Sequence, residues 1–370
     1  MTFSSAITEV NVDLGNKSYP IYIGENILPD LGKYLKKPQM GLATGTKIMV
    51  VTNPLVYDLY GRTVMDSLAE AGFTPIPGEV PDGEEYKTLD SAEHLYDVAF
   101  DNGLDRKSVV LALGGGVIGD LAGFVAATYM RGVTFIQVPT TLLAQVDSSV
   151  GGKVAVNHPR GKNIIGAFYQ PKMVFTDIRT LHTLAQREFR AGMAEVVKYG
   201  VIWDCEFFDF LVNEHAGVMN LNTPEVTRVI STSCSIKARV VEQDETEQDV
   251  RAILNYGHTF GHAYEALTNY KKFVHGEAVA IGMISAAVAA VRLGMLSAGN
   301  LERIKNIIRL YGLPENFGAL APKEIIASMG HDKKAVGGNI KYILPEDIGR
   351  VKIVSGIDND VLTGILSQQV

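Results

Sequence analysis

The stretch Leu113-Gly114-Gly115-Gly116-Val117-Ile118-Gly119-Asp120 directly follows the apolar run Ser108 to Ala112. A short apolar run that ends in clustered glycines predicts a buried strand that turns into a helix. Because glycine has no Cβ, backbone N–H groups at such a turn can approach a pyrophosphate at the helix N-terminus. Gly114, Gly116 and Gly119 also match the spacing of the dinucleotide fingerprint. We therefore expect a nucleotide site at this turn.

The rest of that fingerprint is missing. The next predicted strand, Val133 to Val138, ends in Pro139-Thr140-Thr141. No acidic residue follows the glycines at about twenty positions, where it would bind a ribose hydroxyl. The glycine stretch therefore predicts either a nucleotide site that differs from the ordinary dinucleotide fingerprint or a tight turn that only packs a helix onto a sheet.

Composition favours a globular enzyme of two domains. A chain of 370 residues is too long for one ordinary core, and 46% hydrophobic with 20% charged residues are globular values. The formal charge of −7 argues against broad nucleic-acid binding, which favours a basic face. Cys205 and Cys234 are too few for a disulfide framework or a cysteine-built zinc site.

No segment predicts a membrane span or a secretory signal. The longest apolar stretch, Ala278 to Val291, has 14 residues, short of the roughly 18 that suggest a membrane helix. The first residues include Glu9 and Asp13 and lack an apolar core. We expect a cytoplasmic protein.

The pattern changes near residue 180. Before it, β-branched runs alternate with helical patterns, which predicts a parallel sheet covered on both faces. After it, the pattern is helical, apart from a small hairpin predicted at Ile340 to Leu344 and Val351 to Val354. We predict an α/β domain at 1–180 and a mainly helical domain at 181–370, meeting over a cleft. The predicted strands are Lys47 to Thr52, Ser108 to Leu113 and Val133 to Val138; the helices are Pro54 to Ala71, Ser91 to Asn102, Leu121 to Met130, Gln186 to Trp203, Pro224 to Gln243, Thr259 to Leu267, Glu277 to Leu293 and Asn300 to Tyr311.

Three histidines lie within eighteen positions, at His258, His262 and His275. His258 and His262 stand at i and i+4, so on a helix they share one face. That spacing suits two metal ligands, or one ligand beside a group that moves protons, although a single histidine is more often a core residue. A metal site also needs a carboxylate. Three glutamates qualify, Glu195, Glu265 and Glu277, and the residues alone do not decide between them.

Two further segments combine glycines with charged side chains. Asp147 to Lys153 and Asn157 to Asn163 place flexible backbone beside lysines, which suits an anion, although a solvated basic loop has the same composition. The spacing is not that of a Walker loop. Pro81 to Lys87 is a turn that opens onto a helix, a weak signal by itself.

These segments together identify a family. The chain resembles 3-dehydroquinate synthases over nearly its whole length, through many motifs in one order. The resemblance rests on Asp82-Gly83-Glu84 with Lys87, Gly114 to Asp120, Pro139 to Leu142, Asp147 to Lys153, Gly161 to Asn163, Arg187 to Lys198, Leu254 to His262, His275 to Glu277 and Asp332 to Lys334.

The resemblance implies a Rossmann-like, NAD-binding N-terminal domain and a mainly helical C-terminal domain for metal and substrate. It implies NAD and a divalent metal, zinc first and cobalt second. It also implies that Glu195, His258 and His275 are the ligands, while His262 lies beside the substrate. A Glu-His-His set leaves zinc open to substrate oxygens.

The implied reaction converts 3-deoxy-D-arabino-heptulosonate 7-phosphate into 3-dehydroquinate and phosphate, an early step of the shikimate route. NAD takes hydride from C5, phosphate is eliminated, the hydride returns, the ring opens and an aldol closure forms the carbocycle. NAD emerges unchanged, so the implied enzyme is a lyase. Zinc would act as a Lewis acid on the C4 and C5 hydroxyls.

The resemblance also implies roles for individual residues. Lys237 and Arg251 would face the substrate carboxylate, and Arg131 would reach the phosphate across a homodimer interface. The phosphate would also contact Lys153, Asn163 and one of Lys333 or Lys334. The hydroxyl groups and zinc-bound oxygens would be held by Asp147, Lys198 and Asn255. The implied catalytic residues are His262, Lys153, Lys198, Asn255 and Asp147. The implied NAD site contains Asn53, Asp82, Glu84, Lys87, Gly115, Gly116, Val117, Gly119, Asp120, Thr140, Thr141, Lys153, Lys162, Thr180 and Thr183.

Three alternatives remain open. Another sugar phosphate cyclase would share NAD, metal and mechanism, although without a carboxylate substrate it has less need of Lys237 and Arg251. A glycerol dehydrogenase-like oxidoreductase also has a GGG turn, but has no use for the segment Lys153 to Asn163. A regulatory nucleotide-binding protein would not need Glu195, His258 and His275.

Overall fold

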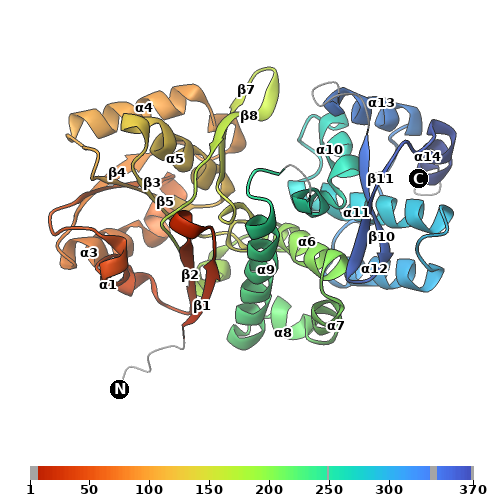
Figure 1. The fold of residues 1–370 in the computed structure, drawn as a ribbon, viewed down its shortest axis with the longest axis horizontal. Coiled ribbons are helices and arrows are strands. Elements are labelled where there is room, and N and C mark those ends of the chain that lie inside the picture. The colour runs from red at the N-terminus through yellow and green to blue at the C-terminus, as the bar shows by residue number, and fades with distance from the viewer. Residues whose placement is uncertain (1–6, 248–249, 334–339, 368–370) are drawn as a thin grey trace. The chain divides into compact units, whose positions relative to one another are not determined.

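The computed structural model describes residues 7–247, 250–333 and 340–367. The chain packs as two compact units (Figure 1). The first unit is Met1–Leu184 with Val226–Thr246, and the second is Ala185–Glu225 with Glu247–Val370.

The first unit is built on a seven-stranded sheet of order β1-β2-β9-β6-β5-β3-β4. Only β1 and β2 pair antiparallel; the other neighbours are parallel, which confirms the predicted parallel sheet. The strands are β1 (Thr8–Val12), β2 (Tyr19–Gly24), β3 (Lys47–Thr52), β4 (Thr74–Glu79), β5 (Val109–Gly114), β6 (Thr134–Pro139) and β9 (Met173–Asp177).

The sequence pattern does not predict β1, β2, β4 or β9. For β4 the reason is visible, because its sequence TPIPGE contains two prolines and a glycine, which weaken a strand prediction. β4 lies at the edge of the sheet and pairs only with β3. An edge strand tolerates proline, since one row of its N–H groups needs no partner.

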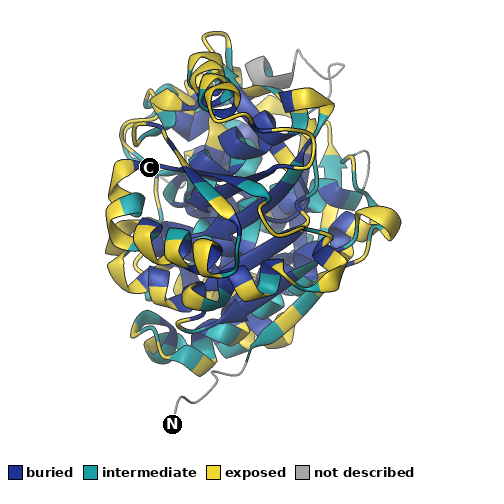
Figure 2. Cartoon of the chain, turned by 90° about the vertical axis from the view of Figure 1, so that its left-hand side faces the viewer, coloured by how far each residue is buried: buried dark blue, intermediate teal, exposed yellow. Residues whose placement is uncertain are grey.

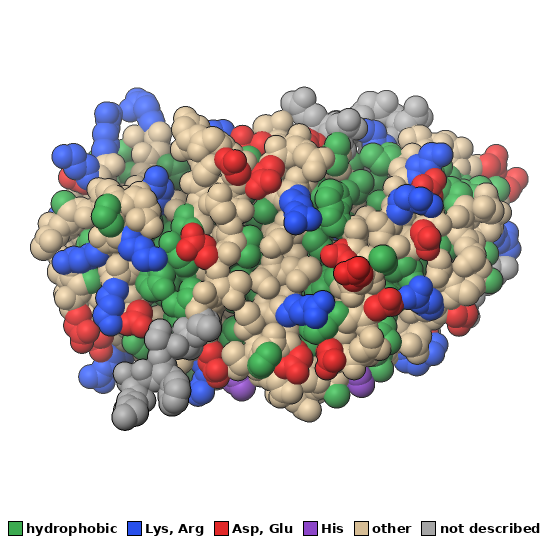
Figure 3. Space-filling view, turned by 60° about the horizontal axis from the view of Figure 1, so that its bottom comes forward, with side chains coloured by type: hydrophobic (Ala, Val, Ile, Leu, Met, Phe, Trp, Pro, Cys, Tyr) green, Lys and Arg blue, Asp and Glu red, His purple; other side chains and the backbone are tan. Residues whose placement is uncertain are grey.

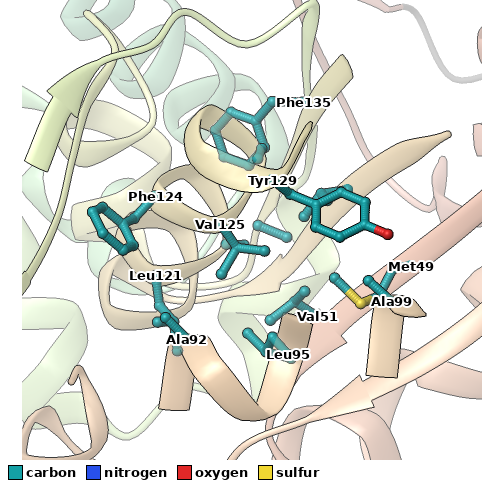
Figure 4. Packing of buried hydrophobic residues seen from close by; sticks show 14 of the residues in the cluster. Met49, Val51, Ala92, Leu95, Ala99, Leu121, Phe124, Val125, Tyr129 and Phe135 are labelled. Carbon is teal, nitrogen blue, oxygen red and sulfur yellow. The ribbon is translucent and has the colours of Figure 1, made fainter. Parts of the chain in front are cut away.

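Helices cover both faces of this sheet. Alternate residues of β3 face opposite sides: Met49 and Val51 pack with α4 and α5 (Figure 4), and Ile48 and Val50 with α1 and α3. Figure 2 shows the strands as buried, with exposed residues on the outer helix faces. The helices are α1 (Leu31–Leu35), α2 (Pro54–Val56), α3 (Arg62–Glu70), α4 (Leu89–Asp101) and α5 (Gly116–Thr128), with a π-helical turn at Tyr57–Gly61.

One helix of the later chain, α9 (Thr223–Gln243), packs with the first unit. The sequence pattern assigns everything after residue 180 to a second domain; the units instead divide at Leu184, and Val226–Thr246 returns to the first. Cys234 Sγ donates a hydrogen bond to the carbonyl oxygen of Gln145, at 3.2 Å. A helical pattern shows which face is apolar but not which surface covers it.

The second unit is mainly helical, as predicted. Glu277 accepts a hydrogen bond from the N–H of Val274 at 3.1 Å, so α11 begins at His275, two residues before its predicted start. The predicted C-terminal hairpin forms from β10 and β11. The elements are α6 (Gln186–Ile202), α7 (Cys205–Asn213), α8 (His215–Met219), α10 (His258–Leu267), α11 (His275–Arg292), α12 (Ala298–Leu310), α13 (Pro322–Lys333), β10 (Lys341–Asp347), β11 (Arg350–Ser355) and α14 (Asn359–Leu366).

Two features of the described residues concern possible partners. None of their helices is both long and apolar enough to cross a membrane. On the face drawn in Figure 3, acidic and basic side chains are interspersed in small groups.

Glycines let α6, α10 and α11 approach closely. A Cβ on Gly282 of α11 would lie 2.0 Å from the carbonyl oxygen of Gly257, just before α10. A Cβ on Gly276 would lie 1.9 Å from the carbonyl oxygen of Ala191 in α6. Backbone cannot yield as a flexible side chain does, so any larger residue at either position would push the helices apart.

We predict that Gly282→Ala lowers stability by roughly 1–3 kcal/mol, the usual cost of overpacking a core. Gly330→Ala, inside α13 with open space around the added methyl, is the control. It should be neutral or stabilising by up to about 1 kcal/mol, because alanine favours the helix. Urea unfolding followed by circular dichroism measures both, and an unchanged Gly282→Ala midpoint would contradict the prediction.

Candidate active site

Three helices of the second unit bring the predicted metal ligands together. Glu195 lies within α6, while His258 and His275 are the first residues of α10 and α11. Glu195 Oε1 is 3.5 Å from His258 Nε2 and 3.6 Å from His275 Nε2. One ligand atom from each of the three residues lies within 4.8 Å of the others.

These separations fit a tetrahedral metal. With zinc–ligand bonds of about 2.1 Å, two ligand atoms of a tetrahedron stand roughly 3.4 Å apart. The two distances from Glu195 Oε1, 3.5 and 3.6 Å, are close to that edge. One carboxylate oxygen and two imidazole nitrogens are also donors that zinc accepts. The residues present therefore fit the metal that the sequence predicted.

The second nitrogen of each ring has its own partner. His258 Nδ1 lies 3.2 Å from the carbonyl oxygen of Tyr256, and His275 Nδ1 lies 3.4 Å from Glu265 Oε1. Both partners accept hydrogen bonds, so the geometry assigns the proton to Nδ1 of each ring. When a ring is neutral, its Nε2 then carries the lone pair, on the side that faces Glu195.

Burial and charge separate the two histidines. Burial lowers the pKa of His258 to about 3, although Glu195 opposes the shift, so this ring stays neutral. Burial also lowers the pKa of His275, but hydrogen bonds to Glu195 and Glu265 outweigh it and raise the pKa to about 9. Without a metal, a proton on His275 therefore balances part of the carboxylate charge, and a metal cation would replace that proton.

The structure distinguishes the three glutamates that the residues alone left open. Glu195 is fully buried and faces both histidines. Glu277 instead caps α11 and accepts two hydrogen bonds from Arg187, at 2.8 and 2.6 Å. Glu265 faces Nδ1 of His275, the side of the ring away from Glu195.

Other predicted residues of the second unit lie around this cluster or near its helices. Lys198, one turn after Glu195 and 1% exposed, forms an ion pair with it. The ring of His262 is 5.4 Å from that of His258, centroid to centroid, and is exposed to solvent. Arg251 is buried, and Asn255 Nδ2 donates to Glu247 Oε1 at 3.1 Å, a partner that the sequence did not predict.

In the first unit, the quoted glycine stretch forms the expected strand-to-helix turn. β5 ends at Gly114, Gly115 is the N-cap, and α5 begins at Gly116. A Cβ on Gly119 would lie 2.9 Å from Gln137 Oε1, and one on Gly115 would lie 3.0 Å from Thr141 Cγ2. The glycines thus serve close packing, and the helix N-terminus that they form is a place where backbone N–H groups can bind a phosphate.

The predicted cofactor residues of this unit gather at one edge of the sheet. Asn53, Asp82, Thr140 and Thr180 follow β3, β4, β6 and β9, as the glycine turn follows β5. Because the carboxyl ends of parallel strands meet at one edge, these residues share the edge where nucleotides bind in such sheets. Contacts join them in pairs: Asn53 Nδ2 donates to Asp82 Oδ1 at 2.7 Å, and the hydroxyl of Tyr60, which the sequence did not indicate, contacts Thr180 and Thr183.

Asp120 is held by a buried lysine. Lys87 Nζ lies 3.0 Å from Asp120 Oδ2 and 3.4 Å from Glu84 Oε1, and Lys162 Nζ lies 3.6 Å from the same Glu84 oxygen. Burial opposes the charge on Lys87, but the carboxylates of Asp120 and Glu84 outweigh it and raise the pKa of Lys87. Three residues predicted for NAD thus form one ion-pair group with a fourth, Lys162.

The predicted basic loop is a β-hairpin, with Lys153 at the start of β7 (Lys153–His158) and Asn163 in β8 (Gly161–Phe168). Asn163 has a φ of 58°, and its N–H donates to Asn157 Oδ1 at 2.9 Å. Asn157, a partner that spacing could not indicate, also donates to Glu84 at 2.8 Å. The hairpin is therefore tied to the Lys87 group.

Two more predicted residues of the first unit form one contact. The Nζ of Lys237, on α9, donates hydrogen bonds to the carbonyl oxygen and to Oδ1 of Asp147, each at 2.7 Å. Lys237 is only 6% exposed. The resemblance implies both residues for substrate, and the structure places them together.

Arg131 lies in a strained turn after α5. Met130 and Arg131 have φ values of 48° and 69°, a backbone conformation that residues other than glycine rarely adopt. Both residues are exposed. Such strain is retained when the surroundings require it and is frequent at functional sites.

The remaining predicted phosphate contact, Lys333 or Lys334, cannot be located. The side chain of Lys333 and all of Lys334 lie outside the described residues.

Solved structures with this fold are enzymes. A 2-epi-5-epi-valiolone synthase from Streptomyces hygroscopicus, described with NAD+ and Zn2+ bound, has TM-score 0.86 and 25% identity, covering 100% of this chain and 99% of that one. A 2-deoxy-scyllo-inosose synthase, complexed with carbaglucose-6-phosphate, NAD+ and Co2+, has TM-score 0.87 and 27% identity, covering 98% and 100%. A probable glycerol dehydrogenase from Sinorhizobium meliloti, at TM-score 0.65, 15% identity and coverage of 93% and 94%, shares the fold alone. Fold and site define an enzyme of the sugar phosphate cyclase class.

Sequence comparison narrows this class to one family. Models of the 3-dehydroquinate synthase N-terminal and C-terminal regions match residues 78–191 and 192–335. The 3-dehydroquinate synthase of Pelotomaculum thermopropionicum is 56% identical over 97% of this chain and 96% of its own. That of Picosynechococcus is 49% identical over 96% and 97%. The chain belongs to the 3-dehydroquinate synthase family.

We predict that Asp120→Ala weakens NAD binding by roughly ten- to a hundredfold, the usual effect of losing a hydrogen bond to a charged group. Zinc content should not change, because Glu195, His258 and His275 lie in the other unit. Asp101→Ala, at the exposed end of α4, is the control. Isothermal titration with NAD measures the effect, and unchanged affinity in Asp120→Ala would leave the glycine turn with a packing role only.

Proposed function

We propose that this enzyme converts 3-deoxy-D-arabino-heptulosonate 7-phosphate into 3-dehydroquinate and phosphate, in the shikimate route. The observation that carries the proposal is the Glu195–His258–His275 cluster, whose spacing fits a tetrahedral metal. The glycine turn of the first unit adds a nucleotide site, and family membership supplies the substrate.

NAD and zinc fit the residues that we assign to them. When bound, NAD would supply a reversible hydride acceptor and zinc a Lewis acid. The first turn of α5 would place N–H groups at the pyrophosphate, and Asn53, Asp82 and Asp120 lie at the same sheet edge. The relatives described with NAD+ and with Zn2+ or Co2+ support this pairing, and cobalt would suit the same ligands.

Charged residues of this chain suit a substrate that carries a carboxylate and a phosphate. We assign Lys237 and Arg251 to the carboxylate, and Lys153 and Asn163 of the hairpin to the phosphate. Lys237 and Arg251 are 6% and 1% exposed, so both cationic groups lie inside the protein, and Lys237 is also hydrogen-bonded to Asp147. An acidic protein can thus concentrate cations where an anion binds.

Proton transfer falls to groups around the metal cluster. His262 is exposed and stands one turn after His258, so it can exchange a proton with water and reach the same site. Lys198 is paired with the buried Glu195 and would orient substrate hydroxyls together with Asn255 and Asp147.

A related cyclase with another sugar phosphate is the nearest competing proposal. Identity favours the dehydroquinate reaction, because the relatives that carry it are up to 56% identical, against 25% and 27% for the two solved cyclases. The dehydrogenases share only the fold, which does not determine the function.

We predict that the chain, supplied with the heptulosonate phosphate, NAD and zinc, releases phosphate and dehydroquinate without accumulating NADH. His258→Ala should lose zinc and turnover together, because only two ligands remain. His94→Ala, on the exposed face of α4, should retain both. Full activity of metal-free protein in chelator would contradict the metal site, and net NADH would favour a dehydrogenase.

We also propose a homodimer in which Arg131 reaches the partner's phosphate site. Arg131 is exposed in a strained turn at the end of α5, and a guanidinium can bind two phosphate oxygens at once. The cytoplasmic location expected from the sequence stays a prediction.

We predict that Arg131→Ala lowers kcat/KM by roughly ten- to a hundredfold without weakening NAD binding. Mixing Arg131→Ala with Lys153→Ala should restore part of the activity. Each heterodimer would have one site with both lesions and one site with neither. If subunit exchange is confirmed and no activity returns, Arg131 does not act across the dimer.

A further inference from the structure

The two histidines of the metal cluster, His258 and His275, have different partners at Nδ1, the ring nitrogen on the side away from Glu195. His258 Nδ1 faces the carbonyl oxygen of Tyr256, which carries no net charge. His275 Nδ1 faces the carboxylate of Glu265, at 3.4 Å. Glu265 is only 5% exposed, and the proposed reaction makes no use of it. A carboxylate buried to this extent is costly unless it has a partner that needs its charge.

The helix that carries Glu265 explains how it reaches this position. Glu265 follows His258 by seven residues and His262 by three, so all three share one face of α10. His275, the first residue of α11, contacts that face of α10 through Nδ1 and the helix α6 through Nε2. Nε2 is 3.6 Å from Glu195 Oε1 and Nδ1 is 3.4 Å from Glu265 Oε1. The imidazole is therefore placed between two carboxylates from two helices.

We propose that Glu265 is a positioning residue of the metal site: its carboxylate accepts a hydrogen bond from Nδ1–H of His275 and so directs the Nε2 lone pair toward the metal. This proposal rests on the metal site of the proposed function. A carboxylate behind a metal-bound imidazole fixes the ring and makes its other nitrogen a stronger donor. The carbonyl behind His258 can fix that ring but adds no charge, so the two ligands differ in strength.

A second cation is the competing explanation, because ligand atoms of His262, Glu265 and His275 also lie within 4.8 Å of one another. A neutral imidazole has one lone pair and one N–H. If Nε2 of His275 binds the first metal, Nδ1 carries the proton and has no lone pair for another. A hydrogen bond from Nδ1–H of His275 to Glu265 therefore explains this contact better than a second metal does.

The test uses the full chain and its isosteric variant Glu265→Gln, with Glu302→Gln as the control. Glu302 lies on α12, its side chain is 66% exposed, and it pairs with Lys305. Metal-free proteins are titrated with zinc in competition with a chromophoric chelator, and with cobalt followed by visible absorption. We expect one zinc per chain in all three proteins, with a Kd raised about 10–100-fold in Glu265→Gln only. The absorption of bound cobalt should also change in Glu265→Gln only.

Folding is separated from positioning by the circular dichroism spectra of the metal-free proteins, which should show the same helix content for Glu265→Gln and the wild type. Glu265→Asp, which keeps the charge on a shorter side chain, should bind zinc with intermediate affinity, and it decides the question if Glu265→Gln does not fold. A Kd within about threefold of the wild type would overturn the proposal. So would two zinc ions in the wild type and one in Glu265→Gln, which would make Glu265 a ligand. If the wild type forms dehydroquinate but binds no zinc, the metal site itself is wrong.

Discussion

The close approach of three helices at glycines is the constraint on which the second unit depends. Gly276 lets α11 lie against the backbone of α6, and Gly282 lets it lie against the backbone before α10. This packing brings the first residues of α10 and α11, His258 and His275, to the buried carboxylate of Glu195. Side chains at these contacts would separate the helices and move the three ligands apart. The geometry of the candidate metal site is thus a consequence of backbone packing.

The same packing makes charge balance necessary. A carboxylate with no exposed surface is costly, and Lys198 and the two histidines surround Glu195 on α6, α10 and α11. The first unit solves the same problem with Lys87, buried between Asp120 and Glu84. In both units, buried charges are held by partners within the protein, so their positions are fixed before any ligand binds. Such preorganised charge is what a site for NAD, metal and an anionic substrate needs.

The fold by itself would support several chemistries. Cyclases and dehydrogenases both have it, with TM-scores of 0.86 and 0.65 for two examples. On this fold, the first unit of the chain carries a set of paired cationic and polar groups. The hairpin β7–β8 ties Asn157 to Glu84, and Lys237 is bonded to Asp147 in the same unit. In the proposed function these groups serve a phosphorylated carboxylate, a role that a simple alcohol substrate would not require.

The sequence by itself determined the order of the parallel-sheet and helical regions and the strand-to-helix turn at the glycines. Through the family resemblance it also predicted Glu195, His258 and His275 as metal ligands, and the structure brings these three residues together. Local pattern is enough for the order of the regions and for the turn, because alternation and helical period are properties of short segments. Only the tertiary structure decided that α9 returns to the first unit, that the basic loop is a hairpin, and that Glu277 caps α11 while Glu265 faces His275. Each depends on contacts between residues far apart in the chain or in different elements, and spacing along the sequence carries no information about which surfaces meet.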